Sequence, residues 1–260
     1  MTILDRLAEH AGKRVALAKS IVSTDTIRKQ AEESPAGNFA FEKALKTRDI
    51  AFICECKKAS PSKGIIAPDF DHLKIAKEYE EGGAECISVL TEPRWFLGSN
   101  RYLTEVADKV KVPCLRKDFT VDEYMIYEAK VLKASAVLLI CSILTPKQLK
   151  EYITLCDKLG LSALVEIHDK AEADMAIDAG ARLIGVNNRD LKSFEVDTDN
   201  SCKLRSMVPS DILFVAESGV SCRADVNKLR QAGADALLIG EALMRAEDKK
   251  KMIAGLRGED

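Results

Sequence analysis

The segment Phe52-Ile-Cys-Glu-Cys-Lys-Lys-Ala-Ser-Pro-Ser-Lys63 is an apolar, strand-like run that ends in charged and hydroxyl-bearing side chains. Successive side chains of a strand point to opposite faces, so Ile53, Glu55 and Lys57 share one face and the two cysteines of the run share the other. A carboxylate and an amine therefore meet where the strand ends. We infer that this face lines a cavity, because packing alone does not require such an ending.

Short apolar runs of this kind recur along the chain, each followed by an amphipathic segment with helical spacing. Eight such strand and helix pairs leave no sheet edge if the sheet closes on itself. We therefore predict an α/β fold, a (β/α)8 TIM barrel. An open doubly wound sheet is the alternative, but no Gly-x-Gly-x-x-Gly turn follows the first strand. The predicted strands are Ile50–Lys57, Cys86–Thr91, Val112–Lys117, Ala136–Cys141, Ser162–Ile167, Leu183–Asn187, Leu213–Glu217 and Ala236–Ile239.

Residues 1–48 precede the first predicted strand and stand outside this repeat. Thr2 is a suitable N-cap for a first helix, and Ser34-Pro-Ala-Gly37 interrupts the helical pattern before it resumes at Phe39. We predict an N-terminal helical extension that either plugs one end of the barrel or covers its catalytic mouth. Spacing alone leaves both roles open. Residues 1–260 are expected to form a single domain, with the barrel over 49–260.

The composition excludes several classes of protein. With 260 residues, 47% hydrophobic content and a net charge of -2, the chain can bury a sizeable core and has no basic surplus for nucleic acid. Its eight cysteines form no Cys-x-x-Cys pair and only three histidines accompany them, so we expect neither a disulfide framework nor a metal site. We interpret the cysteines as small buried hydrophobic residues of a reducing compartment. No secretory signal and no apolar run of about 18 residues is found, which predicts a cytoplasmic protein that does not enter a membrane.

Charged and amide side chains occupy the inward phase at the carboxyl ends of five predicted strands, where TIM barrels carry their chemistry. Each alone could simply enter a solvated loop, and mutual pairing could serve structure only. Together they predict a partly desolvated cluster, because buried Lys and Glu are tolerated when paired and such pairing shifts their pKa values. The candidate catalytic residues are Glu55, Lys57, Lys117, Glu166, Asn187 and Glu217.

Glycines after the last two predicted strands indicate an anion site. Gly219 and Gly240 lie where backbone N–H groups can face a phosphate, and Gly240 also begins a helix whose N-terminus favours negative charge. Ser60, in the loop after the first strand, adds a hydroxyl. Aromatic residues in loops on the same side suggest recognition of a ring, although they could instead cover the core; they are Trp95, Phe96, Phe119 and Phe194.

The sequence resembles the indole-3-glycerol phosphate synthase family over nearly its whole length. The motifs that carry the resemblance are Glu55-Cys-Lys57-Lys-Ala-Ser60-Pro-Ser62, Leu90-Thr-Glu with Phe96-Leu-Gly-Ser99, Leu115-Arg-Lys117-Asp-Phe119, Val165-Glu166-Ile-His, Ile184-Gly-Val-Asn187-Asn-Arg189-Asp-Leu191, Ala216-Glu217-Ser218-Gly219 and Leu238-Ile-Gly240-Glu241-Ala-Leu-Met244. The resemblance implies a barrel whose N-terminal helix lies over the mouth. It also implies a lyase of tryptophan biosynthesis that closes the ring of 1-(2-carboxyphenylamino)-1-deoxyribulose 5-phosphate with loss of carbon dioxide and water, without a metal or organic cofactor.

The resemblance also implies a role for each candidate residue. Ring closure needs a proton for the ketone oxygen, and Lys117, as an ammonium of lowered pKa, is the expected general acid. Lys57 and Glu166 are the expected second acid and base, with Glu55 tuning a lysine through an ion pair. The other expected contacts are Asn187 and Glu217 to the ribulose hydroxyls, Arg189 in the pocket lining, Phe96, Phe119 and Phe194 near the ring, and Ser60, Ser218, Gly219, Gly240 and the backbone N–H of Glu241 at the phosphate.

Two other functions remain open at this point. A barrel of the phosphoribosylanthranilate isomerase kind relies on a Cys and Asp couple, whereas the cysteines of the first strand are out of phase with the mouth. A non-catalytic barrel that binds a phosphorylated metabolite would need the glycines but not Lys117 opposite Glu166. The expected partner is a phosphorylated small molecule, with no nucleic acid or membrane, and the chain is expected to be a monomer or weak homodimer.

Overall fold

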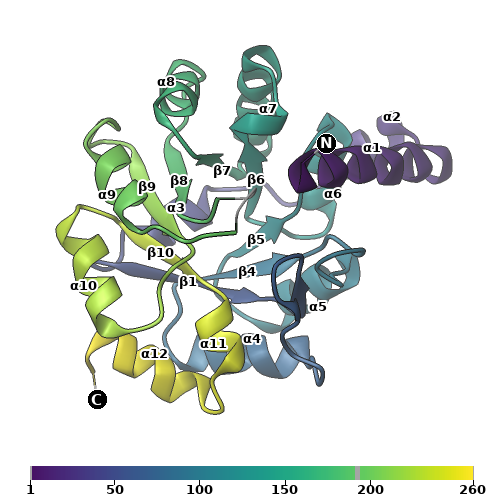
Figure 1. Ribbon diagram of the computed structural model, residues 1–260. Coiled ribbons are helices and arrows are strands. Elements are labelled where there is room, and N and C mark those ends of the chain that lie inside the picture. The colour runs from purple at the N-terminus through teal and green to yellow at the C-terminus, as the bar shows by residue number, and fades with distance from the viewer. Residues whose placement is uncertain (1, 191–193, 260) are drawn as a thin grey trace.

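The computed structural model describes residues 2–190 and 194–259, so Leu191, the last residue of one quoted motif, lies outside the described residues. Within these ranges eight parallel strands form a closed barrel that helices surround (Figure 1). Each barrel strand pairs with the next along the chain, and β1 closes the barrel against β10. The predicted (β/α)8 fold is confirmed. The barrel strands are β1 Ala51–Cys56, β4 Cys86–Leu90, β5 Cys114–Lys117, β6 Ala136–Ile140, β7 Ser162–Ile167, β8 Leu183–Asn187, β9 Leu213–Glu217 and β10 Ala236–Ile239.

Four of these strands are one or two residues shorter at an end than predicted. β5 begins at Cys114, after Pro113, which has no backbone N–H for the sheet. Cys141 begins a short 3₁₀ turn, η1 (Cys141–Ile143), and Lys57 lies just beyond β1. The predicted ends were wrong at these positions, but the inward or outward phase of each side chain is unchanged.

Helices cover the outside of the barrel and alternate with its strands (Figure 1). Gly83, Gly180 and Gly233 follow helices with φ between 87° and 90°, the left-handed conformation that glycine adopts without steric cost. The helices after β1 are α4 His72–Glu81, α5 Asn100–Lys109, α6 Glu123–Val131, α7 Pro146–Leu159, α8 Lys170–Asp178, α9 Asp199–Arg205, α10 Arg223–Gln231, α11 Glu241–Arg245 and α12 Lys249–Arg257.

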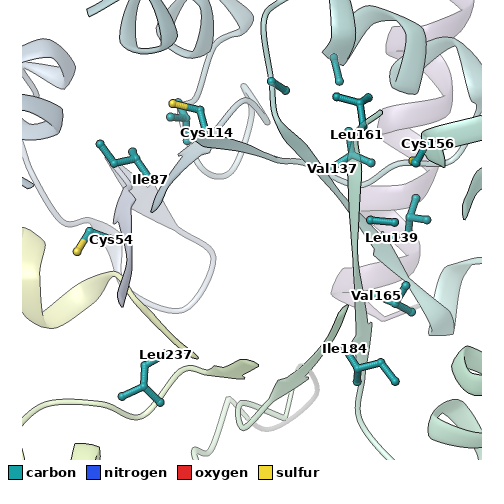
Figure 2. Close-up of a cluster of buried hydrophobic side chains, with 14 of the residues drawn as sticks. Cys54, Ile87, Cys114, Val137, Leu139, Cys156, Leu161, Val165, Ile184 and Leu237 are labelled. Carbon is teal, nitrogen blue, oxygen red and sulfur yellow. The ribbon is translucent and has the colours of Figure 1, made fainter. Parts of the chain in front are cut away.

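The hydrophobic core has an outer layer between strands and helices and an inner layer within the barrel. Figure 2 shows outer-layer side chains, among them Cys54 and Leu237, pointing away from the ring of strands. Ile53 and Leu115 belong to the inner layer, so the predicted phase of the strands is confirmed. All eight cysteines are free, but Cys202 is only half-buried and Cys222 is exposed, so the prediction of buried cysteines is wrong for these two.

The N-terminal extension performs both of the roles considered for it, with different helices. Thr2 caps α1 (Ile3–Ile21), and this helix lies over the carboxyl ends of the strands, where Arg14 binds Asp118 just after β5. α2 (Thr24–Glu33) continues beside α6 (Figure 1). α3 (Ala40–Leu45) closes the opposite end, since its Phe41 joins the inner core and its backbone binds Ser162 at the start of β7.

One short element on the catalytic side was not predicted. β2 (Ala59–Ser60) and β3 (Gly64–Ile65) form a two-stranded antiparallel hairpin in the loop that follows β1. The hairpin holds Ser60 beside the barrel mouth. Among the helices of the described residues, none has both the length and the apolar character that crossing a membrane requires.

Candidate active site

A cavity of about 550 Å³ opens at the carboxyl ends of the barrel strands. All of the candidate residues except Trp95 line it, whether predicted to be catalytic or to bind substrate; they are Glu55, Lys57, Ser60, Phe96, Lys117, Phe119, Glu166, Asn187, Arg189, Phe194, Glu217, Ser218, Gly219, Gly240 and Glu241. The structure therefore brings together residues that are up to 186 positions apart, from Glu55 to Glu241.

Lys117 occupies the centre of the polar floor. Its Nζ lies 3.4 Å from Oε2 of Glu166 and 3.3 Å from Oε2 of Glu217, so the amine bridges carboxylates from β7 and β9. Asn187, at the end of β8 between these strands, donates from Nδ2 to Oε1 of Glu166 at 3.4 Å. A Cβ atom at Gly185 would collide with the Glu217 carboxylate, so this strand position needs glycine for the cluster to form.

Lys57 and Glu55 form a second ion pair on the other side of the cavity, with 2.6 Å between Nζ and Oε1. Ser88 Oγ lies 3.4 Å from the other oxygen of Glu55. A Cβ atom at Gly240 would lie 2.5 Å from Glu55 Oε1 and 2.8 Å from Lys57 Nζ. The glycine after β10 is therefore needed for the close approach of this pair as well as for its place at the start of α11.

The charge state of Lys117 differs from the prediction. Burial disfavours the ammonium, but the carboxylates of Glu217, Glu166 and Glu55 outweigh burial and raise the pKa of Lys117 above its ordinary value. The expected lowered pKa is thus wrong for the protein without substrate. Lys117 is an ammonium at neutral pH, which is the form that a proton donor requires.

The pKa values of the two carboxyl groups beside Lys117 are shifted in opposite directions. Burial would raise the pKa of Glu166, but Lys117, His168 and the Asn187 amide outweigh it and hold the pKa below the ordinary value. For Glu217, burial and the negative charges of Glu166 and Glu55 raise the pKa, and Lys117 lowers it. The raising effects are larger, so the pKa of Glu217 is raised to about 7. Glu166 is therefore ionised at neutral pH and able to accept a proton, whereas Glu217 is partly protonated.

The side of the cavity predicted to hold phosphate is formed by the segments that follow β9 and β10. Ser218 and Gly219 both have left-handed φ values, 67° and 89°, and a Cβ atom at Gly219 would lie 2.7 Å from Thr198 Cγ2. The Ser218 hydroxyl donates to Oδ1 of Asn187 at 3.1 Å, so it is already engaged within the cluster. If this turn binds a phosphate as predicted, the contact therefore falls to its backbone N–H groups.

Glu241 directs its carboxylate toward cations at the rim. Its oxygens lie 3.2 Å from Arg245 Nε, 3.7 Å from Lys63 Nζ and 3.8 Å from Arg189 Nη2. The carboxylate thus has its own partners, and a phosphate contact through the backbone N–H of this residue stays a prediction.

Aromatic side chains form the apolar wall. Phe96 and Phe119 lie with ring centroids 6.0 Å apart, and Phe194 contributes from the loop after β8. Trp95 does not line the cavity; its ring makes an edge contact with His10 of α1 at 5.3 Å. Trp95 is partly buried and packs against the inner core, so for this residue the alternative, an aromatic that covers the core, is the correct one.

Other residues near the site were not predicted from the sequence. Ile3 and Leu7 of α1 line the mouth, and their spacing of four residues on an apolar helix stripe is the signal that identifies them. Arg245 of α11 and Ser221 after β9 also line the cavity. His168 lies behind Glu166. It is two residues further along the chain, and the period-2 alternation of a strand could have placed it on the same side as Glu166. Among the described residues, no group of three or more His, Cys, Asp or Glu is arranged to hold a metal ion.

Comparison with known proteins agrees with this geometry. A family model described as indole-3-glycerol phosphate synthase matches residues 4–256. A protein of that name from Ruminiclostridium cellulolyticum is 54% identical over 260 residues, which cover 98% of this chain and 99% of the relative. Another, from Lachnoclostridium phytofermentans, is 48% identical over 267 residues, with 98% of each chain covered.

Solved structures with much lower identity share the fold. A 3-hexulose-6-phosphate synthase matches with a TM-score of 0.66 at 14% identity, covering 80% of this chain and 99% of that chain. A thiamine phosphate pyrophosphorylase from Pyrococcus furiosus matches with a TM-score of 0.60 at 18% identity, covering 80% and 94%. These likenesses concern the barrel alone, whereas the full-length matches at about half identity concern the family. The chain belongs to the indole-3-glycerol phosphate synthase family.

Proposed function

We propose that Lys117, Lys57 and Glu166 carry the proton transfers by which this chain closes the ring of 1-(2-carboxyphenylamino)-1-deoxyribulose 5-phosphate. The observation that supports this most strongly is the position of the Lys117 ammonium, 3.4 Å from an ionised Glu166 on the floor of one cavity. An acid and a base held within one site suit a reaction that both gives and removes protons.

Lys117 is the proposed acid for ring closure. The aromatic carbon that bears the carboxylate attacks the substrate's ketone, and the ketone oxygen becomes an alkoxide as the new carbon–carbon bond forms. An alkoxide is more basic than an amine, so an ammonium with a raised pKa can still protonate it. The raised pKa ensures that Lys117 is charged before the reaction begins.

Loss of carbon dioxide and water then completes the indole. The electron pair of the departing carboxylate restores the aromatic ring, and the hydroxyl formed in the first step leaves as water. Lys57 is the proposed donor of the proton that the hydroxyl takes with it, and the ion pair with Glu55, 2.6 Å away, holds this amine in place. Glu166 is the proposed base that takes the proton released as the second double bond of the pyrrole ring forms.

The remaining lining residues hold the substrate in this proposal. Asn187 and Glu217 lie next to the acid and base, where the ribulose hydroxyls would be placed. The turns at Gly219 and Gly240, with Ser60 opposite them, offer backbone N–H groups and a hydroxyl to the phosphate. Arg189 adds a positive charge, and the wall of Phe96, Phe119 and Phe194 accommodates the aromatic ring.

The assay follows formation of the indole product by its fluorescence. Lys117→Met is expected to abolish turnover, by about a hundredfold or more, while substrate binding stays measurable. Glu166→Gln is expected to lower kcat far more than it changes KM. Lys109→Met removes an exposed lysine on α5 and serves as the matched control with wild-type kinetics. Turnover by Lys117→Met at the wild-type rate would refute the acid role, and a change in KM alone for Glu166→Gln would refute the base role.

The same assay bears on the two other functions considered from the sequence. An isomerase would convert its own substrate without producing indole fluorescence, and a binding protein would retain ligand without turnover. We further propose that the extension and the barrel form a single domain, and that the chain works in the cytoplasm as a monomer or weak homodimer, without nucleic acid. The eight free cysteines support a reducing location. Light scattering over a range of concentrations measures the oligomeric state.

A further inference from the structure

His168 lies directly behind Glu166, and the reaction described above gives it no task. It follows β7 and is two residues beyond Glu166, so strand alternation puts both side chains on the same side of the chain. The His168 Nε2 atom lies 3.5 Å from Oε1 of Glu166, the oxygen that does not face Lys117. The Glu166 side chain lies between Lys117 and His168, and because it is only 3% exposed it has little access to water.

The orientation of the His168 ring is set by α8. Oε2 of Glu172 accepts the backbone N–H of His168 at 2.7 Å and lies 3.2 Å from ring Nδ1. On the other side, the amide of Asn200 in α9 donates to the carbonyl oxygen of His168 at 3.2 Å. The ring is therefore held from behind with Nε2 facing the active-site carboxylate, and this buried Nε2 has no hydrogen-bond partner among the described residues.

Acidic groups outnumber the amines at this site. The buried carboxyl groups of Glu55, Glu166 and Glu217 face two amines, Lys57 and Lys117, and Glu217, whose pKa is raised to about 7, is only partly ionised at neutral pH. His168 is a third basic group, and it lies between the carboxylates of Glu166 and Glu172. The charged groups that face it are Glu172 on α8, Glu166 on β7 and Glu217 on β9. Burial opposes its protonation, but the hydrogen bond with Glu172 and these charges raise the pKa of His168 to about 9, so it is a cation at neutral pH.

The positive charge next to Glu166 matters most in the middle of the reaction. When Lys117 gives its proton to the substrate, the amine becomes neutral and no longer offsets the charge of Glu166. A carboxylate that loses its cation in a buried site tends to take up a proton, which would remove the base before it is needed. A second cation on the far oxygen of Glu166 prevents this.

We propose that His168 is a positioning residue that keeps the Glu166 carboxylate ionised and directed into the cavity while Lys117 is discharged. This inference rests on the base role of Glu166 in the proposed function. His168 itself does not line the cavity, so it acts on the substrate through Glu166. A purely structural role, in which the histidine ties β7 to α8, would affect the melting temperature but not the pH dependence of turnover.

The test is His168→Gln, which keeps an amide donor at this position and removes the positive charge. In the profile of kcat against pH, the acidic limb is expected to move to higher pH by about one unit, because Glu166 is harder to ionise without a neighbouring cation. At neutral pH kcat is expected to fall about tenfold, because the carboxylate loses the contact that aims it. KM is expected to stay within about twofold, since no group that binds substrate is removed.

The chain provides a matched control. His72 forms a similar pair with Glu105, at 2.6 Å between Nε2 and Oε2, but lies outside the cavity lining. His72→Gln is expected to leave kcat, KM and the acidic limb unchanged. His168→Lys restores a cation and is expected to bring the acidic limb back toward that of the unaltered protein.

Each outcome decides the question. A folded His168→Gln variant with an unchanged acidic limb and an unchanged kcat overturns the proposal, even if its melting temperature is lower. If the variant does not fold, NMR titration of the imidazole in the unaltered protein replaces it; a His168 that is neutral at pH 7 overturns the proposal. If the unaltered protein forms no indole product, the proposed function is refuted. If the unaltered protein turns over normally and His168→Gln changes neither kcat nor its pH dependence, only the inference about His168 is refuted.

Discussion

The contact between Arg14 and Asp118 fastens α1 over the catalytic mouth, and removing it is the most informative test of the extension. Arg14 Nη1 and Nη2 bind the two oxygens of Asp118 at 3.1 and 2.6 Å. The Asp118 side chain is fully buried, with 0% exposure, and that of Arg14 is 22% exposed. Arg14→Met keeps much of the apolar stem of the arginine and removes its charge.

The cost of this change follows from what remains around Asp118. Breaking a buried ion pair by removing one partner typically costs about 3–5 kcal/mol, because the other charge stays buried. Asp118 keeps the Thr91 hydroxyl at 2.6 Å, its hydrogen bond from the Phe119 N–H at 2.8 Å and the more distant guanidinium of Arg116 at 3.9 Å. We therefore expect a loss at the lower end, about 3 kcal/mol, which corresponds to a fall in melting temperature of roughly 6–12 °C.

The assay combines thermal unfolding with steady-state kinetics. α1 places Ile3 and Leu7 at the mouth, so a loosened helix is expected to raise KM severalfold with a smaller effect on kcat. Lys13→Met is the matched control on the same helix, because the pair of Lys13 with Glu9 is exposed and worth little. Equal melting temperatures for Arg14→Met and Lys13→Met would refute the reasoning, as would an unchanged KM.

The pH dependence of this contact has a definite sign. Burial would raise the pKa of Asp118, but the hydrogen bond and charge of Arg14, with Arg116 and Thr91, lower it below 3.8. A carboxyl group whose pKa is depressed in the folded state stabilises the fold above its unfolded pKa, and this contribution is lost as the pH falls through the folded pKa. The difference in stability between the unaltered protein and Arg14→Met should therefore be full at neutral pH and shrink in acid below about pH 4.

Two further predictions concern groups within the cavity. Gly240→Ala places a methyl group 2.5 Å from Glu55 Oε1 and 2.8 Å from Lys57 Nζ, so it should lower kcat with little change in melting temperature. Gly12→Ala is the control, because nothing lies within 4 Å of the added methyl group, and it should leave kcat unchanged. A fully active Gly240→Ala would contradict the need for glycine beside the ion pair of Glu55 and Lys57. The raised folded pKa of Glu217, about 7, means that its stabilising contribution is full below its unfolded pKa of about 4.3 and is lost as the pH rises to 7. Glu217→Gln should therefore gain stability relative to the unaltered protein between pH 5 and 8, and a pH-independent difference in denaturant unfolding would show that the group does not titrate there.

The barrel could be predicted from the sequence because each strand and each helix has its own local pattern of apolar residues, and this pair of patterns recurs along the chain. Alternation along a strand decides which side chains face the axis, and this places Glu166 and Glu217 in the cavity without any knowledge of their neighbours. The predicted strand ends were less accurate, because an end depends on local details such as Pro113 before β5. An error of one or two residues there does not change which face a residue occupies.

The N-terminal extension was harder to predict because its helices contact different ends of the barrel. The boundary between α1 and α2 has a local signal, since Ser23 caps α2 by accepting the N–H of Thr26 at 3.2 Å. No local signal states that α1 lies over one end and α3 over the other. That assignment depends on partners such as Asp118 and Ser162, which are more than 100 residues away along the chain.

The pKa of Lys117 could not be predicted for a related reason, and its direction changes how the site must be understood. Alternation predicts an inward lysine, but the direction of the shift depends on how many carboxylates converge on it from other strands. Glu55, Glu166 and Glu217 together outweigh burial, so the amine is held charged. The substrate carries a carboxylate and a phosphate, and these anions must enter a site that already contains three carboxyl groups. Partial protonation of Glu217 near pH 7 and the second cation at His168 both reduce the repulsion that the substrate meets. The same carboxylates that keep Lys117 ready as a donor therefore require compensating groups, and one of these, His168, lies just after β7 and outside the cavity lining.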